Sequence, residues 1–429
     1  MMKTVLIIAG SDPGAGAGLQ QDLKVATLLG AYGLTVVTAL TVQNSQGVSA
    51  VHPVAPEVVD AQLDAILSDF PVAAVQVGML ATADIVRVVA RRLQELKPKY
   101  LVVDPVLAAS SGAPLLDPAG VAALQEEIFP LTCLLTPNAP EAARLTGLEV
   151  TTAAHLEEAA RRLQKLGPEW VLAKGGHLPG EPVDVLTDGE NAYHLPNARL
   201  TAPHGHGSGC ALAAACAAGL ARGLSVPEAV NQARTLVVQA LRWGLPLGRG
   251  RGPVNPYAPF ARDAARYQVI ESLRMAATRL QREDISPLVP EVMSNLGYAA
   301  PYAETPQDVA AFPGRLIKSP QGLIIPAPPA FGASRHLAAF IVTALNTHPH
   351  LRAAMNLKLV EGLEEMAALL ALRVAPALKT GEPPPDLIYA QEDGGQEPMV
   401  YILGPDPQAV VEKALALKNA LSAAGKLAE

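Results

Sequence analysis

The chain has 429 residues, of which 50% are hydrophobic and 17% are charged, and its formal net charge is −7 at pH 7. A chain of this length is longer than a single domain with one hydrophobic core usually is, so we expect two or three domains. The negative charge and scattered basic residues argue against a nucleic-acid partner, and no apolar run reaches the length of a membrane span. The three cysteines (Cys133, Cys210 and Cys216) lie in no metal-ligand spacing, and so sparse a set is typical of a reducing cytosol. We therefore expect a cytoplasmic globular protein without membrane or nucleic-acid partners.

Short apolar runs alternate with helical patterns in the first half of the chain. This alternation predicts an α/β fold with a mostly parallel sheet flanked by helices and with ligands at the carboxyl ends of the strands. The predicted strands are Val5–Ala9, Leu34–Leu40, Ala74–Val77, Leu101–Val103, Cys133–Leu135 and Val171–Ala173. The predicted helices are Leu19–Leu29, Glu57–Leu67, Ala83–Leu96, Pro118–Ile128, Ala154–Leu166, Gly209–Gly223 and Val226–Trp243.

Gly, Pro and Arg gather between Gly244 and Pro259, a composition that suits neither a helix nor a sheet ladder. We place a domain boundary here, with one domain at residues 1–258 and a smaller α+β domain at residues 262–429. In the second domain we predict helices at Arg262–Gln281, Arg335–Leu345, Arg352–Leu370 and Pro407–Leu421. We predict strands there at Leu387–Tyr389 and Met399–Leu403.

The run Gly207-Ser208-Gly209-Cys210 opens an Ala-rich predicted helix. Glycines let backbone N–H groups approach an oxyanion closely, and the helix N-terminus adds the positive end of a dipole. The tetrapeptide therefore predicts a phosphate site, with a buried Cys after a flexible loop as the alternative. We also expect the helix start to lower the pKa of Cys210 toward the thiolate.

Polar residues follow most of the predicted strands of the first domain. Asp104 ends the fourth strand, Asn138 and Glu141 follow the fifth, and Lys174 ends the sixth. The oxygen ligands of Asp104, Asn138 and Glu141 suit Mg²⁺, and Lys174 supplies a cation for phosphate oxygens. Together with the glycine-rich helix start, they predict a phosphotransferase or another phosphate-binding enzyme.

Several separated motifs of residues 4–256 then resemble, in the right order, the hydroxymethylpyrimidine (phosphate) kinases of thiamin biosynthesis. They are Ala9-Gly10-Ser11-Asp12-Pro13, Gly16-Ala17-Gly18-Leu19-Gln20-Gln21-Asp22-Leu23-Lys24, Ala39-Leu40-Thr41-Val42-Gln43-Asn44, Lys174-Gly175-Gly176-His177, His206-Gly207-Ser208-Gly209-Cys210 and Gly252-Pro253-Val254-Asn255. The resemblance implies a ribokinase-like fold and two ATP-dependent phosphorylations of 4-amino-5-hydroxymethyl-2-methylpyrimidine.

The resemblance also implies roles for single residues. Gly10, Asp22, Gln43 and Met79 contact the pyrimidine in this interpretation, and an amide such as Gln43 can both donate to and accept from an aminopyrimidine edge. Cys210 stands where the wider ribokinase superfamily has its Asp base. Ser208 replaces a common Thr, a change that keeps the residue small. We interpret His206 as structural in preference to a phosphate contact.

The second domain carries its own set of motifs, which include Pro290-Glu291-Val292-Met293-Ser294-Asn295, Phe312-Pro313-Gly314-Arg315-Leu316, Gly332-Ala333-Ser334-Arg335-His336 and Arg352-Ala353-Ala354-Met355-Asn356. In this order they resemble the thiamin-phosphate synthase domain found fused behind pyrimidine kinases. The resemblance implies condensation of the pyrimidine diphosphate with hydroxyethylthiazole phosphate. Arg315, Ser334 and His336 would face the leaving pyrophosphate, and Glu291, Asn295 and Asn356 would contact the ring or phosphate.

Two other functions compete with this bifunctional enzyme. The second domain could be a non-catalytic sensor of thiamin phosphates that regulates the kinase, although Arg315 and His336 favour catalysis. The first domain could instead be a sugar or pyridoxal kinase with a structural tail, although Cys210 and Gln43 argue against it. The expected ligands are ATP, Mg²⁺, the aminopyrimidine and the thiazole phosphate, and the apolar Ala-rich helices suit a homodimer.

Overall fold

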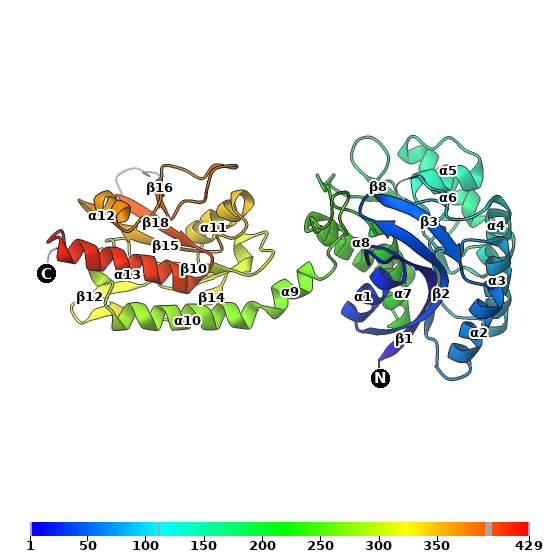
Figure 1. Ribbon diagram of the computed structural model, residues 1–429, viewed down its shortest axis with the longest axis horizontal. Helices are drawn as coiled ribbons and strands as arrows, with labels where there is room; N and C mark the ends of the chain where they lie inside the picture. Colours follow the sequence, from blue (N-terminus) through cyan, green and yellow to red (C-terminus); the bar gives the residue numbers. More distant parts are fainter. Residues whose placement is uncertain (1, 110–111, 391–396, 428–429) are drawn as a thin grey trace. The chain divides into compact units, whose positions relative to one another are not determined.

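The computed structural model describes residues 2–109, 112–390 and 397–427. It divides the chain into two compact units, Met1–Pro259 and Phe260–Glu429 (Figure 1). The division falls beside the Gly- and Pro-rich segment in which composition places a domain boundary. Each unit has its own sheet and its own buried core. In the described parts of the chain, no helix combines the length and the hydropathy that crossing a membrane requires.

A nine-stranded sheet forms the centre of the first unit, in the order β3-β2-β1-β4-β5-β6-β7-β8-β9. Its strands are β1 (Lys3–Ser11), β2 (Ala31–Asn44), β3 (Gly47–Pro53), β4 (Ala74–Val77), β5 (Leu101–Val103), β6 (Leu134–Leu135), β7 (Trp170–Ala173), β8 (Val183–Thr187) and β9 (Ala192–Pro196). Neighbours from β2 to β7 are parallel, whereas β3, β8 and β9 pair antiparallel at the two edges. The six predicted strands are the six parallel ones. The strands β3, β8 and β9 were not predicted. The residues of β3 and β9 are part-exposed or exposed, which breaks the apolar pattern, whereas β8 is mostly buried but carries the polar residues Asp184 and Thr187.

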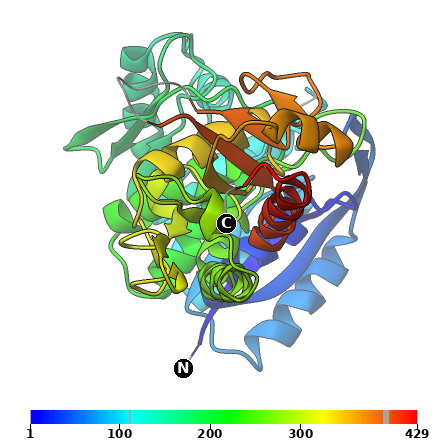
Figure 2. The same cartoon turned by 90° about the vertical axis from the view of Figure 1, so that its left-hand side faces the viewer.

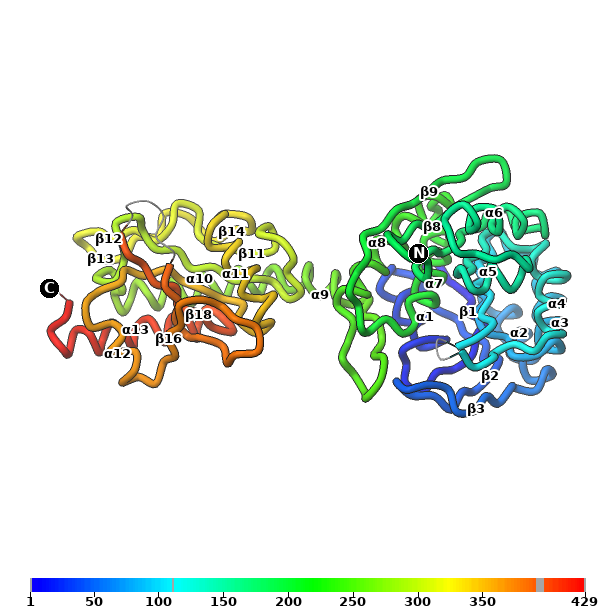
Figure 3. Tube along the Cα trace, turned by 90° about the horizontal axis from the view of Figure 1, so that it is seen from above, coloured from blue at the N-terminus to red at the C-terminus, as the bar shows by residue number. Residues whose placement is uncertain are grey.

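Helices cover both faces of this sheet (Figures 1 and 3). One face carries α2 (Pro56–Leu67), α3 (Ala83–Leu96), α4 (Pro118–Ala123, continued by a π-helical turn at Leu124–Ile128), α5 (Ala139–Thr146) and α6 (Ala153–Gln164). The other face carries α1 (Gly18–Leu28), α7 (Ser208–Ala221) and α8 (Val226–Arg242). Every residue of α7 from Ala211 to Ala221 is buried, and the small side chains let this helix lie directly on β1 and β4.

A seven-stranded sheet forms the centre of the second unit, in the order β14-β11-β10-β15-β18-β17-β16. The strands are β10 (Leu296–Ala299), β11 (Val309–Ala311), β14 (Ala330–Phe331), β15 (Ala353–Lys358), β16 (Val374–Ala375), β17 (Leu387–Tyr389) and β18 (Met399–Gly404), with β12 (Ile317–Ser319) and β13 (Gly322–Ile324) in a separate hairpin. The helices α10 (Arg266–Arg282) and α13 (Pro407–Ala423) lie side by side on one face (Figure 2), with α12 (Leu363–Leu369) next to α13. On the other face lies α11 (His336–Thr347), and α9 (Ala258–Ala264) precedes α10 in the chain.

The predicted helix at Arg352–Leu370 is wrong. Its first part is the strand β15, which pairs with β10 on one side and with β18 on the other, and only Leu363–Leu369 is helical. The segment is rich in Ala, Met, Leu and Lys, which are good helix formers. It is nevertheless a central strand, because the flanking strands β10 and β18 form hydrogen bonds with its backbone on both sides. Tertiary context therefore overrides local propensity here.

Candidate active site

Two helix starts meet at the carboxyl end of β1. Gly207 is the N-cap of α7 at φ 81°, and a Cβ there would lie 1.7 Å from the carbonyl oxygen of Gly16. Gly18 begins α1 at φ 57°, and a Cβ there would lie 2.3 Å from the carbonyl oxygen of Gly10. Only glycine fits either position, because each combines a left-handed backbone with backbone contact. The starts of the two helices therefore lie against each other, and a helix N-terminus is suited to bind an anion.

An ion pair lies directly beneath the start of α7. The Nζ atom of Lys174, after β7, is 2.8 Å from Oδ1 of Asp104, after β5, and the Thr136 hydroxyl donates to the same oxygen at 3.0 Å. A Cβ on Gly209 would lie 3.3 Å from Asp104 Oδ2 and 3.4 Å from Lys174 Nζ. Burial opposes the charge of Lys174, but Asp104 and Glu141 hold the pKa of Lys174 above its ordinary value. The ammonium group thus stays charged where a phosphate at the helix start would lie.

Asn138 and Glu141, two predicted magnesium ligands, form the capping box of α5. The Asn138 side chain accepts from the Glu141 N–H at 2.9 Å, and Oε2 of Glu141 accepts from the Asn138 N–H at 2.7 Å. Burial raises the pKa of Glu141 to about 7, against the attraction of Lys174. In the described residues, no group of three or more His, Cys, Asp or Glu side chains is placed to hold a metal ion.

Cys210 lies in the first turn of α7, but its ionisation differs from our expectation. Burial raises the pKa of the Cys210 thiol, and the carboxylates of Asp22 and Asp104 raise it further. The N–H of Gly18 and the charge of Lys174 lower the pKa of Cys210, but by less than burial and the two carboxylates raise it. The prediction that the helix start lowers the pKa of Cys210 is therefore wrong, because it left out burial and the carboxylates of Asp22 on α1 and Asp104 after β5. At neutral pH this residue is a thiol.

The predicted pyrimidine contacts gather at the same end of the sheet, and one of them, Asp22, is buried there. Gly10 and Met79 adjoin each other, since a Cβ on Gly10 would lie 2.9 Å from Met79 Sδ, and Gln43 is at the end of the neighbouring β2. The sequence also predicts a substrate contact for Asp22, whereas its side chain is 1% exposed and lies against Gln76. Its Oδ1 atom has no hydrogen-bond partner, and burial raises the pKa of Asp22 well above the usual value.

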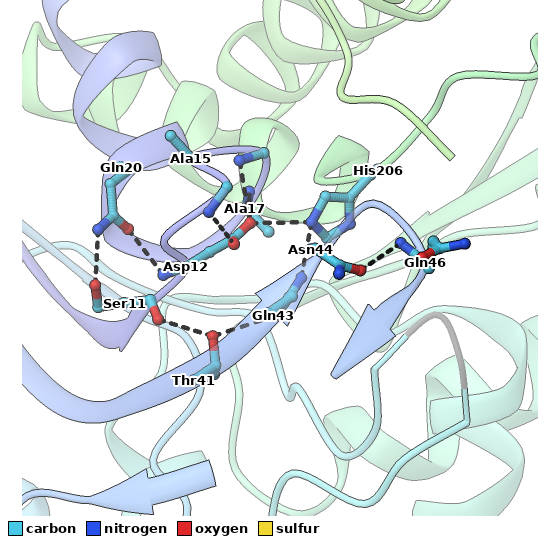
Figure 4. Close-up of polar contacts among 12 residues, drawn as sticks. Ser11, Asp12, Ala15, Ala17, Gln20, Thr41, Gln43, Asn44, Gln46 and His206 are labelled. Carbon is cyan, nitrogen blue, oxygen red and sulfur yellow. Dashed lines mark hydrogen bonds and ion pairs between the residues drawn. The ribbon is translucent and has the colours of Figure 1, made fainter. Parts of the chain in front are cut away.

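Sequence reasoning missed the role of Asp12. Its side chain is nearly buried and accepts hydrogen bonds from the N–H groups of Gly14, Gly16 and Ala17 at 2.8 to 3.0 Å (Figure 4). It also lies 3.0 Å from Nε2 of His206. Burial alone would raise the pKa of Asp12, but His206 and the loop N–H groups hold it below its usual value. A carboxylate at the first position of a Pro- and Gly-containing turn is the signal that could have identified it.

The second unit brings four of its six predicted site residues together. Asn356 on β15 accepts from the N–H of Asn295 at 2.7 Å, and Asn295 holds Phe312 through two hydrogen bonds of 3.0 Å. Arg315, at φ 65°, donates to the carbonyl of Val292, which follows Glu291.

Ser334 and His336 lie at the start of α11, where Arg335 is the N-cap.

A parallel sheet with a lysine–carboxylate pair beneath a glycine-bearing helix start is the arrangement of an α/β enzyme that transfers phosphoryl groups to small molecules. The first unit thus defines a phosphotransferase of the ribokinase-like fold class.

A model of the family described as phosphomethylpyrimidine kinase matches residues 12–255, and one described as thiamine-phosphate synthase ThiN matches residues 272–416. The chain belongs to the phosphomethylpyrimidine kinase family, whose members use ATP.

Individual relatives agree with this assignment. The chain is 49% identical over 253 residues to the thiamine biosynthesis bifunctional protein ThiED of Geobacter sulfurreducens, a match that covers 59% of this chain and 52% of that protein. It is 47% identical over 257 residues to a hydroxymethylpyrimidine/phosphomethylpyrimidine kinase of Mycobacterium bovis, covering 59% and 93% of the two chains. The crystal structure of an ADP complex of Bacillus subtilis pyridoxal kinase is 35% identical, with a TM-score of 0.57, and the match covers 61% of this chain and 99% of that one.

Replacing Gly207 by Ala tests the contact between the two helix starts. We expect Gly207→Ala to lower the ATP-dependent kinase rate by about 100-fold, because a displacement of an ångström at a reacting group has this effect. Gly223→Ala is the matched control, since Gly223 also has positive φ (96°) but has open space around its Cα. Tryptophan fluorescence follows folding of the first unit, because Trp170 and Trp243, the chain's two tryptophans, both lie there. Equal rates for the two variants would contradict the prediction.

The raised pKa of Cys210 predicts slow alkylation at neutral pH. The rate of reaction with iodoacetamide should increase steadily with pH and show no inflection below about pH 8.5, the value of an ordinary thiol. Mass spectrometry of the labelled peptide separates Cys210 from the buried Cys133 and Cys216. Rapid labelling of Cys210 at pH 7, with an inflection near or below neutrality, would show that the helix dipole dominates after all.

Proposed function

We propose that this chain carries out three consecutive steps of thiamin formation. The first unit phosphorylates 4-amino-5-hydroxymethyl-2-methylpyrimidine with ATP and then phosphorylates the monophosphate. The second unit joins the diphosphate to hydroxyethylthiazole phosphate and releases pyrophosphate, which gives thiamin monophosphate. The observation that carries the proposal is the charged Asp104–Lys174 pair beneath the start of α7, in a chain of the phosphomethylpyrimidine kinase family.

In the kinase step, catalysis depends mainly on positioning the substrates and on stabilising charge in the transition state. Phosphoryl transfer passes through a loose transition state with charge on the phosphoryl oxygens, so fixed cations and N–H groups stabilise it. Gly207, Ser208 and Gly209 place backbone N–H groups at the helix start, and Lys174 lies within reach below them. We assign the Cys210 thiol to orienting the hydroxymethyl group rather than to removing its proton as a thiolate.

The carboxylates of this site fit a magnesium ion. Lys174 and Thr136 both contact Oδ1 of Asp104, and the Asn138 N–H contacts Oε2 of Glu141. We propose Asp104 Oδ2 and Glu141 Oε1 as the protein ligands, with Asn138 less favoured because its Oδ1 already accepts from the Glu141 N–H. Such an ion, when bound, neutralises charge on the phosphate oxygens, and Mg²⁺ commonly binds through one or two carboxylates plus phosphates.

The second unit is a synthase in this proposal, and Arg315 is its main anion-binding residue. The Asn295–Asn356 hydrogen bond and the positive φ of Arg315 fix the loop that carries the guanidinium group. Ser334 and His336 then contact the other substrate or a phosphate at the start of α11. A sensor of thiamin phosphates remains the competing function, because the same groups could bind the product without catalysis.

Two variants that each disable one unit test the whole scheme. Lys174→Gln should lower pyrimidine phosphorylation by about 100- to 1,000-fold, because it removes the charge that stabilises the transferred group, and it should leave the synthase step intact when the diphosphate is supplied. Arg315→Gln should instead lower the synthase rate and leave pyrimidine phosphorylation intact. The exposed Lys165→Gln and Arg282→Gln are the matched controls.

The decisive mixture contains both variants, the pyrimidine alcohol, ATP, Mg²⁺ and the thiazole phosphate, with thiamin monophosphate measured by chromatography. Product formed by the mixture but by neither variant alone supports the proposal. If the unaltered chain binds thiamin monophosphate tightly and never forms it from the diphosphate, the second unit is a sensor.

We further propose that the chain works in the cytoplasm as a homodimer. The buried α7 cannot supply the contact between copies, but Leu40 and Val42 of β2 are 54% and 50% exposed and offer apolar area. Light scattering of the purified chain should give twice the 44.6 kDa mass of one copy. A mass of one copy that does not change with concentration would exclude the dimer.

A further inference from the structure

Three side chains from distant parts of the first unit meet around one nitrogen atom. Nε2 of His206 lies 2.9 Å from Nε2 of Gln43 and 3.0 Å from Oδ2 of Asp12 (Figure 4). Gln43 belongs to β2, and the β2–β3 ladder shifts register between Val42 and Gln43. Such an irregularity re-aims the side chains beside it. The side chain that the kinase function assigns to the pyrimidine is therefore also held by a histidine.

His206 is itself fixed on all sides. Its N–H donates to the Gly252 carbonyl, and its carbonyl accepts from the Val254 N–H, both at 3.1 Å. Its ring packs against Gly16, where a Cβ would lie 2.4 Å from His206 Cδ2. The His206 side chain is 19% exposed. The ring therefore presents Nε2 to Asp12 and Gln43 in one orientation.

The charge of Asp12 decides which nitrogen of His206 carries the proton. An ionised carboxylate only accepts hydrogen bonds, and Asp12 already accepts from Gly14, Gly16 and Ala17. Nε2 of His206, at 3.0 Å from Asp12 Oδ2, must therefore carry a hydrogen, because two lone pairs would otherwise face one another. Because this nitrogen carries one hydrogen, its N–H is shared between Asp12 Oδ2 and the Gln43 amide in a three-centre hydrogen bond.

We propose that His206 is a positioning residue that sets the direction of the Gln43 amide, and with it the hydrogen-bond polarity that the substrate meets. The NH₂ and oxygen of Gln43 exchange by half a turn about the last side-chain bond. Only the arrangement with Oε1 toward His206 pairs a donor with an acceptor, since Nε2–H and NH₂ are both donors.

The Gln43 NH₂ group then faces Thr41. The Thr41 hydroxyl oxygen lies 3.4 Å from Oε1 of Gln43, and the exchange puts the NH₂ group at that position. Because the Thr41 hydroxyl donates to the Ser11 carbonyl at 2.9 Å, its oxygen can accept from that NH₂ group. The contacts of His206 and Thr41 thus fix which way the Gln43 amide points.

This direction selects a class of substrate, an inference that rests on the proposed kinase function. One N–H and one lone pair of the Gln43 amide remain for a ligand, on fixed sides. They suit a heteroaromatic ring with an amine beside a ring nitrogen, where donor and acceptor also have a fixed order. A pyridine alcohol such as pyridoxal has no amine beside its ring nitrogen. Its binding would leave this N–H and lone pair of the part-buried Gln43 amide without hydrogen-bond partners, which lowers the affinity for it.

Two measurements test the proposal. In the full-length chain, the ¹⁵N–¹H NMR signals of His206 should show hydrogen on Nε2, with His206→Gln used to identify the signals. A proton on Nδ1 with a bare Nε2 would overturn the proposal. This measurement needs no substrate and is independent of the proposed function.

Steady-state kinetics supply the second measurement, with the pyrimidine alcohol and pyridoxal as alternative substrates. His206→Leu should raise KM for the pyrimidine about tenfold, the effect of one hydrogen bond, while kcat and KM for ATP change less. Its preference for the pyrimidine over pyridoxal should fall by a similar factor. His206→Gln should recover most of the preference because its amide N–H can replace Nε2–H.

The exposed His155→Leu is the matched control. Equal losses of kcat with both substrates, with no recovery in His206→Gln, would show a merely structural role and reject the proposal. If the unaltered chain phosphorylates pyridoxal and not the pyrimidine, the proposed function fails instead, whatever the NMR signals show.

Discussion

The contact between Gly207 and the Gly16 carbonyl is the constraint on which the first unit depends. It joins the loop after β1 to the start of α7, and a single added carbon atom would lie 1.7 Å from the oxygen. Because the two loops lie so close, two helix N-termini serve one site, and Cys210, Gly209 and the Asp104–Lys174 pair fall beneath them. A phosphate site and a pyrimidine site can then share one end of the sheet.

The same closeness explains the electrostatics of the site. Asp22, Asp104 and Glu141 come from separate elements and converge where water is largely excluded, so burial raises the pKa of both Glu141 and Cys210. Lys174 keeps its charge because it is surrounded by acids. The site is therefore arranged around one reliable cation and several groups whose ionisation is costly, which suits charge stabilisation better than resting thiolate chemistry.

The sequence predicts the first unit well and the second poorly, for physical reasons. Parallel central strands such as Val5–Ala9 are continuous apolar runs, and polar residues at their ends mark the site. The second unit instead has a mostly antiparallel sheet, and the helix-forming composition of β15 conceals a central strand. Contacts across long separations were also out of reach: Asp12 and His206 are 194 residues apart, and no local pattern predicts that one sets the proton of the other.

The burial of α7 from Ala211 to Ala221 has a consequence for hydrogen exchange. The first turn, Ser208 to Cys210, is part-exposed, whereas the rest of the helix is covered on every side. Amide hydrogens in such a covered segment exchange with solvent only through a larger opening of the structure, which the part-exposed ends of β2 and β3 do not need. The helix start that would meet a phosphate is thus the accessible end of a slowly exchanging helix.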